Sequence, residues 1–210
     1  SLSDTFSYLP GTEKEVRDIA AMLEAQSLST SLLTGAEAQE RTLNRLASPH
    51  ILHIATHGFF LPDSARGLMV EADQAMLRSG LLLAGANQSI QQAGRTAKDN
   101  DGILLAAEAA QLNLQQTQLV VLSACETGLG STQGSEGVLG LQRAFREAGA
   151  RYLIMSLWQV PDAPTQQMIS LFYQYWIADQ LPIRQAFSKA QKDMQQQYAP
   201  YAWAGFVLVE

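Results

Sequence analysis

The feature that most constrains this chain is an apolar run that ends at its single cysteine. Residues 119–122 read Leu-Val-Val-Leu, the small residues Ser123 and Ala124 follow, and then come Cys125 and, three residues later, Gly128. A short apolar run with β-branched members, closed by a turn signal, is typical of a buried strand. Open α/β sheets place their active sites at the carboxyl ends of such strands. The pattern therefore predicts a functional position for Cys125.

A second stretch of the sequence has the same form. Residues 50–58 read His-Ile-Leu-His-Ile-Ala-Thr-His-Gly, so an apolar strand is expected to end at His57 and Gly58. Two strands that end in a cysteine and a histidine predict a nucleophile and its base. No carboxylate or asparagine is marked as a third member, so we expect a dyad. His53, inside the apolar run, and His50, before it, are less suited to the role of base.

Helical and strand patterns alternate along the whole chain. A capping box formed by Thr12 and Glu15 predicts the start of the first helix. Helices are expected over residues 12–26, 37–46, 103–112 and 136–148, and after Pro161 and Pro182; strands are expected over residues 30–35, 50–58, 80–85, 119–125, 151–158 and 204–209; residues 88–100 are expected to form a loop. Such alternation predicts an α/β fold with a mainly parallel sheet covered by helices on both faces.

The composition excludes several classes of protein. The 210 residues, 47% of them hydrophobic, suit one α/β domain that spans residues 1–210. A net charge of −6 without any Lys/Arg cluster argues against direct nucleic-acid binding, and no apolar run is long enough to cross a membrane. One cysteine forms no internal disulfide, which favours a cytoplasmic protein. The chain begins with Ser1 rather than Met, so we expect a fragment of a longer protein or a processed chain.

Each candidate residue also has an ordinary structural interpretation. Cys125 could be a small apolar core residue, although the helix expected soon after it favours a thiolate. His57 could be a core histidine whose nitrogens are satisfied. Asp162 could be an ordinary helix N-cap or a buried acid in a substrate pocket, and Glu126 a solvated loop acid or a pocket acid. One cysteine and three histidines lack the spacing of a zinc site, so neither a metal nor another cofactor is expected.

Several motifs together resemble one family. They are residues 51–58 (ILHIATHG), 120–128 (VVLSACETG), 136–141 (EGVLGL), 156–160 (SLWQV) and 203–207 (WAGFV), with 8–11 (YLPG) near the start. On these motifs, which cover nearly the whole chain, the sequence resembles the CHAT domain, a bacterial relative of caspases and separase.

The resemblance implies a caspase-like three-layer sandwich and cysteine endopeptidase activity. His57 would match the family's catalytic histidine and Cys125 its nucleophile, and the backbone N–H groups of Gly58 and Cys125 its oxyanion hole. Asp162 would line the pocket for a basic residue before the cut, with Glu126 as a second substrate-binding acid, so cleavage after Arg is expected. The family's first strand is expected to be missing, which would leave a gap, or an edge filled by another chain, between the strand at residues 30–35 and the His57 strand.

Three functions remain open on the sequence. The first is a cysteine endopeptidase that cleaves a protein substrate and is regulated by a partner or by helical repeats outside this chain. The second is a catalytically silent interaction or scaffold domain with the same fold. The third is an acyltransferase or another thiol hydrolase.

Overall fold

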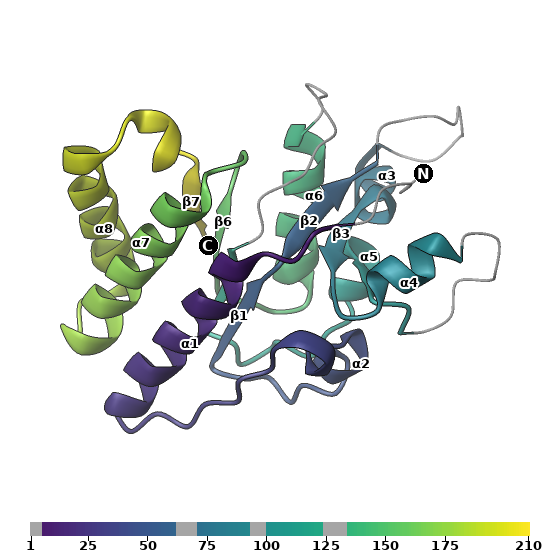
Figure 1. Ribbon diagram of the computed structural model, residues 1–210, viewed down its shortest axis with the longest axis horizontal. Coiled ribbons are helices and arrows are strands. Elements are labelled where there is room, and N and C mark those ends of the chain that lie inside the picture. Colours follow the sequence, from purple (N-terminus) through teal and green to yellow (C-terminus); the bar gives the residue numbers. More distant parts are fainter. Residues whose placement is uncertain (1–5, 62–70, 93–99, 124–133) are drawn as a thin grey trace.

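Three of the four strands of the central sheet run parallel. The computed structural model of the protein describes residues 6–61, 71–92, 100–123 and 134–210 (Figure 1). The strand order is β1 (Ile51–Ala55), β5 (Leu119–Ser123), β6 (Tyr152–Ser156) and β7 (Phe206–Val209). β7 alone is antiparallel, and it pairs with β6 at the edge of the sheet. The mainly parallel α/β architecture predicted from the sequence is thus confirmed, and it agrees with a caspase-like sandwich.

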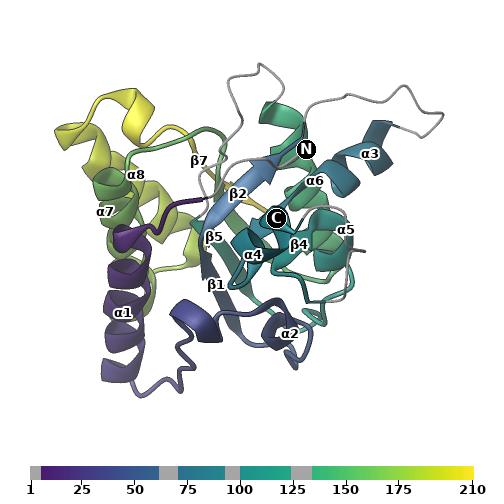
Figure 2. The same ribbon diagram turned by 45° about the vertical axis from the view of Figure 1, so that its right-hand side comes forward.

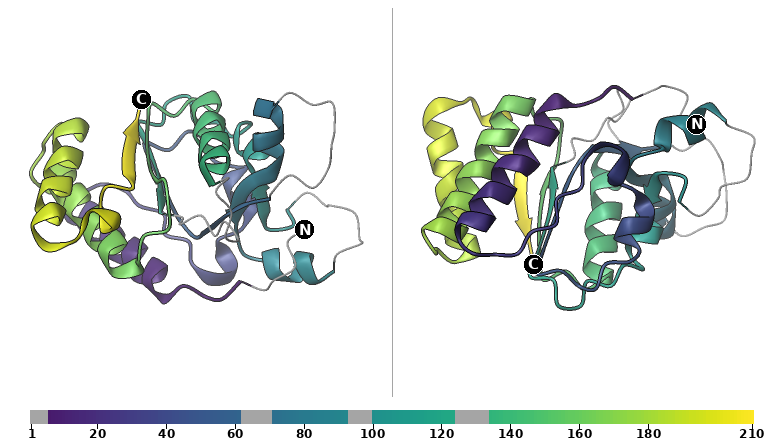
Figure 3. Two further views of the ribbon diagram at one scale, coloured as in Figure 1. Left: turned by 90° about the horizontal axis from the view of Figure 1, so that it is seen from above. Right: turned by 60° about the horizontal axis from the view of Figure 1, so that its bottom comes forward.

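Both faces of this sheet are apolar because its strands are covered by helices on each side. On β5, Leu119 and Val121 join one hydrophobic core, while Val120 and Leu122 join the other. The first core includes residues of α1 (Pro10–Ala25), α7 (Asp162–Tyr173) and α8 (Ile183–Gln197). The second includes residues of α3 (Glu71–Arg78), α5 (Ala106–Ala109) and α6 (Gly134–Glu147). Seen from above, the sheet stands between these two sets of helices (Figure 3).

A second, antiparallel sheet receives the chain where β1 ends. It consists of β2 (His57–Phe60), β3 (Ser79–Leu82) and β4 (Ile103–Leu105), with β3 in the middle. The single strand predicted over residues 50–58 is therefore wrong, because the chain bends at Thr56 and continues as β2 (Figure 2). The Thr56 hydroxyl donates to the carbonyl of Leu82, and the Thr56 N–H donates to the carbonyl of Ser123 at 3.2 Å. These two bonds hold the bend against both sheets.

Other predicted elements also differ from the structure. Residues 103–112 were predicted to be helical, but they form β4 and then the short α5, because the first three residues pair with β3. Residues 30–35 form no strand and run as an extended segment into a 3-10 turn, Gly35–Glu37. The helix predicted over residues 37–46 is reduced to α2, Glu40–Leu43, and part of the predicted loop is α4, Ala86–Gln91.

The start of α1 differs from the predicted capping box. The helix begins at Pro10, and its N-cap is Leu9, whose side chain caps nothing. The Thr12 hydroxyl donates to the carbonyl of Leu9 at 2.7 Å rather than accepting an N–H bond from Glu15. A proline suits the first helical position because its missing N–H has no partner there anyway. Glu15 is buried on the inner face of the helix, where it makes contacts described below.

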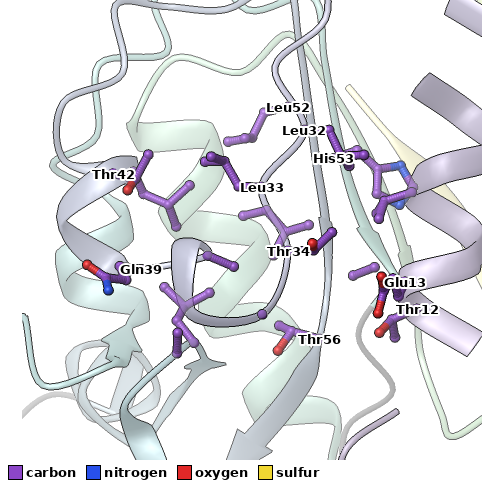
Figure 4. Close-up of a pocket in the computed structure, with 18 of the residues that line it drawn as sticks. Thr12, Glu13, Leu32, Leu33, Thr34, Gln39, Thr42, Leu52, His53 and Thr56 are labelled. Carbon is purple, nitrogen blue, oxygen red and sulfur yellow. The ribbon is translucent and has the colours of Figure 1, made fainter. Parts of the chain in front are cut away.

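The second edge of β1 pairs with no strand of the described chain. Beside it, a pocket of about 970 Å³ lies between β1, α1 and the extended segment that precedes α2. Leu32, Leu33 and Thr34 of that segment line the pocket together with His53 of β1 and Glu13 of α1 (Figure 4). The strand predicted over residues 30–35 is absent, so the structure has no gap between two strands there; the described chain shows instead an open edge of β1. Among the described helices, none combines the length and the apolarity that crossing a bilayer requires.

Candidate functional site

The imidazole of His57 lies where the chain passes from the central sheet into the second sheet. Its Nε2 atom is 2.8 Å from the backbone carbonyl oxygen of Ser7. A carbonyl oxygen only accepts hydrogen bonds, so Nε2 carries the proton and donates it. In the neutral imidazole the other nitrogen, Nδ1, is then an acceptor, which is the state that a general base requires. The sequence predicted no third partner for the pair, and the structure supplies one from the main chain.

The segment that carries the Ser7 carbonyl is itself held in place. The Phe6 ring packs against the His57 ring with 5.4 Å between centroids. The Asn87 side chain of α4 accepts a hydrogen bond from the Phe6 N–H and donates one to the Phe6 carbonyl, both at 2.9 Å. Sequence reasoning missed all three residues. A backbone carbonyl has no side-chain pattern in the sequence, and Asn87 stands directly before the polar stretch 88–100 that was expected to form a loop.

Strand register relates His57 to the cysteine strand. Ala55 of β1 and Ser123 of β5 are register partners on neighbouring parallel strands. His57 follows Ala55 by two residues, and Cys125 follows Ser123 by two residues. Cys125 and Glu126 lie outside the described residues. The two strands that were predicted to end in the candidate pair are therefore neighbours that reach the same edge of the sheet in register.

Gly58, the other predicted oxyanion-hole residue, is buried. It is the second residue of β2 and is the register partner of Leu81 on β3. The position directly after His57 is thus fixed by the second sheet.

A small pocket of about 70 Å³ lies beside His57. Its walls come from the turn before α1, from α1, from the ends of β1 and β5, and from the start of α7; they include Gly11, Glu15, Ser123, Gln159 and Asp162. A Cβ atom on Gly11 would lie 3.4 Å from the Cβ of Asp162, so the first turn of α1 lies close to the first turn of α7. The pocket thus has carboxylates on two sides.

Asp162 lines this pocket but is exposed, unlike the buried acid considered from the sequence. It is also not a helix N-cap, because Pro161 occupies the cap position and Asp162 is the first residue of α7. An acid in the first turn of a helix is favoured by the helix dipole. Its carboxylate is accessible to a ligand in the pocket.

The loop before Asp162 is anchored to the carboxyl-terminal part of the chain. The Leu157 N–H donates to the carbonyl of Gly205 at 2.8 Å. The Trp158 indole donates to the carbonyl of Tyr201 at 2.8 Å, and its ring stacks on the Tyr201 ring with 6.0 Å between centroids. Gly205 has no Cβ, and one there would lie 2.7 Å from the Trp158 ring. These contacts therefore fix the position of the loop that leads into α7.

Glu15 is a buried acid that the sequence reasoning assigned to helix capping. Its Oε1 atom lies 2.8 Å from Nε2 of His53, so this histidine, less suited to the role of base on the sequence, is paired with a buried acid. A signal was available, because Glu15 stands one helical turn before the buried Ile19 and shares its face. Within the described residues, no three His, Cys, Asp or Glu side chains form a group that could hold a metal.

Comparison with protein families identifies the chain. The model of the CHAT domain matches residues 2–210, which is nearly the entire sequence. The chain belongs to the CHAT domain family. The resemblance inferred from the motifs around His57 and Cys125 is thereby confirmed.

Two mammalian proteins are similar to this CHAT domain over most of its length. Human Tetratricopeptide repeat protein 28 is 29% identical over 218 residues, and the mouse protein of the same name is 28% identical over 218 residues. Each alignment covers 96% of this chain but 8% of the relative. The chain thus spans less than a tenth of the length of these relatives. The bacterial origin that the sequence predicted stays a prediction.

Proposed function

We propose that this CHAT domain is a cysteine endopeptidase in which His57 and Cys125 form the catalytic pair. One observation carries the proposal: His57 donates from Nε2 to Ser7, which leaves Nδ1 as the acceptor, at the end of the strand that is in register with the cysteine strand. A cysteine and a histidine on adjacent strand ends are an arrangement suited to a thiol nucleophile and its base.

The proposed reaction has two steps. The Cys125 thiol gives its proton to Nδ1 of His57, and the thiolate sulfur attacks the carbonyl carbon of the scissile peptide. The imidazolium then returns this proton to the leaving amine as the C–N bond breaks, which leaves a thioester. A water molecule, deprotonated by His57, attacks the thioester, and the proton returns to the thiol as the acid product leaves.

The oxyanion of each tetrahedral intermediate requires donors. The backbone N–H groups of Gly58 and Cys125 are the proposed pair. Losing one such donor in comparable sites costs about 3–4 kcal/mol of transition-state stabilisation. Neither step needs a cofactor.

The proposed substrate is a protein cut after an arginine. The supporting feature is the pocket beside His57, which has the accessible carboxylate of Asp162 in its wall. A guanidinium offers two parallel N–H bonds to a carboxylate, whereas an ammonium is a point charge. Glu126 is proposed as a second acid that faces the substrate.

The proposed setting is a longer, regulated cytoplasmic protein. The similar mammalian proteins are named for tetratricopeptide repeats, which are stacked helical hairpins with extended binding surfaces. Repeats of this kind, or a separate partner, would control access to the site.

The decisive experiment is a peptide-library cleavage assay on the purified protein, with labelling by a thiol-reactive peptide probe. Cys125→Ala and His57→Ala are each expected to lower kcat by about 10⁴-fold or more, while circular dichroism and the unfolding midpoint stay close to those of the wild type. His50→Ala, which alters a histidine before β1, is the matched control and should cleave normally. Full turnover by Cys125→Ala would refute the mechanism.

The alternative is a catalytically silent interaction domain. It is favoured by the names of the similar proteins, which refer to repeats and to no catalytic activity. Absence of both cleavage and probe labelling in the wild type would support it. Esterase activity without peptide cleavage would instead support an acyltransferase or another thiol hydrolase.

A further inference from the structure

A buried carboxylate links the two strands whose ends carry the candidate pair. Glu15 of α1 is 3% exposed. Its Oε1 atom is 2.8 Å from Nε2 of His53 on β1, and its Oε2 atom accepts a hydrogen bond from the Ser123 hydroxyl on β5 at 3.0 Å. Each oxygen of one carboxylate thus has a partner on a different strand of the central sheet.

His53 extends this connection to a second helix. Because a carboxylate accepts hydrogen bonds, Nε2 of His53 carries the proton, and its Nδ1 atom is 3.2 Å from the hydroxyl of Tyr173 on α7. Tyr173 is fully buried. Burial, and then the nearby charge of Glu15, raise the pKa of Tyr173 well above its ordinary value, so its hydroxyl keeps its proton. Three hydrogen bonds therefore join α1, β1, β5 and α7.

These four elements are the ones that lead to the candidate site. α1 follows directly after the segment that holds the Ser7 carbonyl, and α7 begins at Asp162. Ser123 precedes Cys125 by two residues, and its carbonyl accepts the N–H of Thr56, the residue before His57. Glu15, Ser123 and His57 all line the same small pocket.

We propose that Glu15 is a positioning residue that fixes the carboxyl ends of β1 and β5, the strands that lead to His57 and toward Cys125, relative to each other. The proposal rests on the proposed peptidase function. Glu15 is assigned no contact with the reacting atoms. It acts through Ser123 and His53.

The chemistry of the network favours positioning over simple stability. A buried charged group is seldom a better filler than an apolar side chain of similar volume, because it must first be removed from water. The Glu15 carboxylate instead contributes specificity of position. Its hydrogen bonds to β1 and β5 can both form in only one register of the two strands. A shift of about 1 Å between reacting groups can cost about 100-fold in rate, so a small movement of either strand end has a large effect.

The experiment compares kcat and KM for Glu15→Gln and Ser123→Ala with those of the wild type, on the best peptide from the library. Glu15→Gln keeps the size of the side chain and removes its charge, and Ser123→Ala breaks one bond while leaving the pair of Glu15 with His53. Each is expected to lower kcat by about tenfold or more with KM within about twofold. Glu13→Gln is the matched control, because Glu13 lies two residues away on the same helix and, within the part of the chain that the structure describes, bonds Tyr8 and Arg17 rather than either strand. Equal kcat values, or a loss explained by the unfolded fraction, would overturn the proposal.

A second readout separates this inference from the peptidase function. Amide hydrogen exchange at Thr56, measured by NMR, reports the bond between the two strand ends even in a protein without activity. Glu15→Gln is expected to speed exchange at Thr56 by about tenfold and to leave Val121, in the middle of β5, unchanged. Unaltered exchange at Thr56 would overturn the positioning role. A wild type that neither cleaves nor takes the probe would refute the peptidase function alone.

Discussion

Nε2 of His57 lies 2.8 Å from the carbonyl oxygen of Ser7, although 50 residues separate the two in the sequence. The bond fixes the tautomer of the imidazole, and it does so through the main chain. The orientation of His57 therefore depends on where the segment before α1 runs, and not on which side chain stands at position 7.

Removing the segment is therefore expected to matter more than changing the side chain. Deletion of residues 1–7 should lower kcat by about 100-fold, because His57 loses the acceptor that holds its ring. Ser7→Ala keeps the carbonyl and should retain wild-type kcat. Peptide cleavage at saturating substrate measures both. A deletion variant with normal kcat would show that the carbonyl does not orient the base.

Asn87 should act on the site from a distance. Asn87→Ala removes two hydrogen bonds to the backbone of Phe6, each worth about 1 kcal/mol, and so loosens the segment over His57. We expect kcat to fall by about tenfold. Gln91→Ala, an exposed change on the same helix, is the control. If the two variants cleave equally fast, the hydrogen bonds from Asn87 on α4 are not needed to hold the segment at Phe6 and Ser7 in place.

Asp162 should determine the preference for a basic residue without holding the fold together. Asp162→Asn keeps the shape and removes the charge, so cleavage after Arg should fall by about 10- to 100-fold in kcat/KM. Because the side chain is exposed and caps no helix, the unfolding midpoint in urea should scarcely change. Alkylation of Cys125 by a small thiol reagent should also be unaffected. A library that prefers Asp or an apolar residue before the cut would contradict the assignment.

Glu40 should make stability depend on pH. Burial raises the pKa of this carboxyl, the charges of Glu108 and Asp101 add to the rise, and N–H bonds from Gly102 and Asn100 oppose it. Its folded pKa exceeds the ordinary value of about 4.5, so its contribution to stability is complete below that value. The contribution is lost as the pH rises through the folded pKa. Glu40→Gln, which cannot ionise, should therefore gain stability relative to the wild type between pH 4 and pH 7.

Urea unfolding at the two pH values measures this difference. Glu37→Gln, on the exposed 3-10 turn, controls for the loss of one negative charge. The prediction fails if the gap between Glu40→Gln and the wild type is the same at both pH values.

Gly140 lies where α6 approaches α3 closely. A Cβ atom there would be 2.5 Å from the Ser79 hydroxyl oxygen and 2.8 Å from the carbonyl of Ala75. Alanine favours a helix over glycine by about 1 kcal/mol, but overpacking costs about 1–3 kcal/mol, so Gly140→Ala should lower the free energy of unfolding. Leu139→Ala, at a neighbouring side chain that is 59% exposed, should change it little. Denaturant unfolding measures the difference. A Gly140→Ala variant that is more stable than the wild type would mean that α6 and α3 can move apart without a loss of packing energy.

The two middle strands of the central sheet, β5 and β6, were predictable because they are buried on both faces. The continuous apolar runs at residues 119–122 and 152–155 indicate buried strands even when the neighbouring strand is unknown. The helices after them have regular apolar spacing. The motifs around His57 and Cys125 sufficed to predict two strands with a candidate residue at the end of each, and the structure showed that these strands are neighbours.

The second sheet and the hydrogen bonds within the candidate site could not be predicted from the sequence. The short apolar run at Ile103–Leu105 suits a helix or a strand equally well, and pairing with β3 decided it. Glu15 matched a capping pattern, but its burial against His53 and Ser123 decided its role. The acceptor of His57 is a main-chain atom, for which no side-chain pattern exists.

One edge of β1 pairs with no other strand in the described ranges of the chain, and this open edge affects how the protein behaves in solution. The N–H of Thr56 faces β5, so by alternation along the strand the backbone groups of Ile51, His53 and Ala55 point toward the other edge. That edge borders an apolar pocket, with the partly exposed Leu32 and Leu33 in its wall. Open backbone next to apolar side chains templates the pairing of further chains. Concentrated samples of the isolated chain are therefore expected to self-associate along β1, and a lysine introduced at Leu33 should reduce the association seen by light scattering.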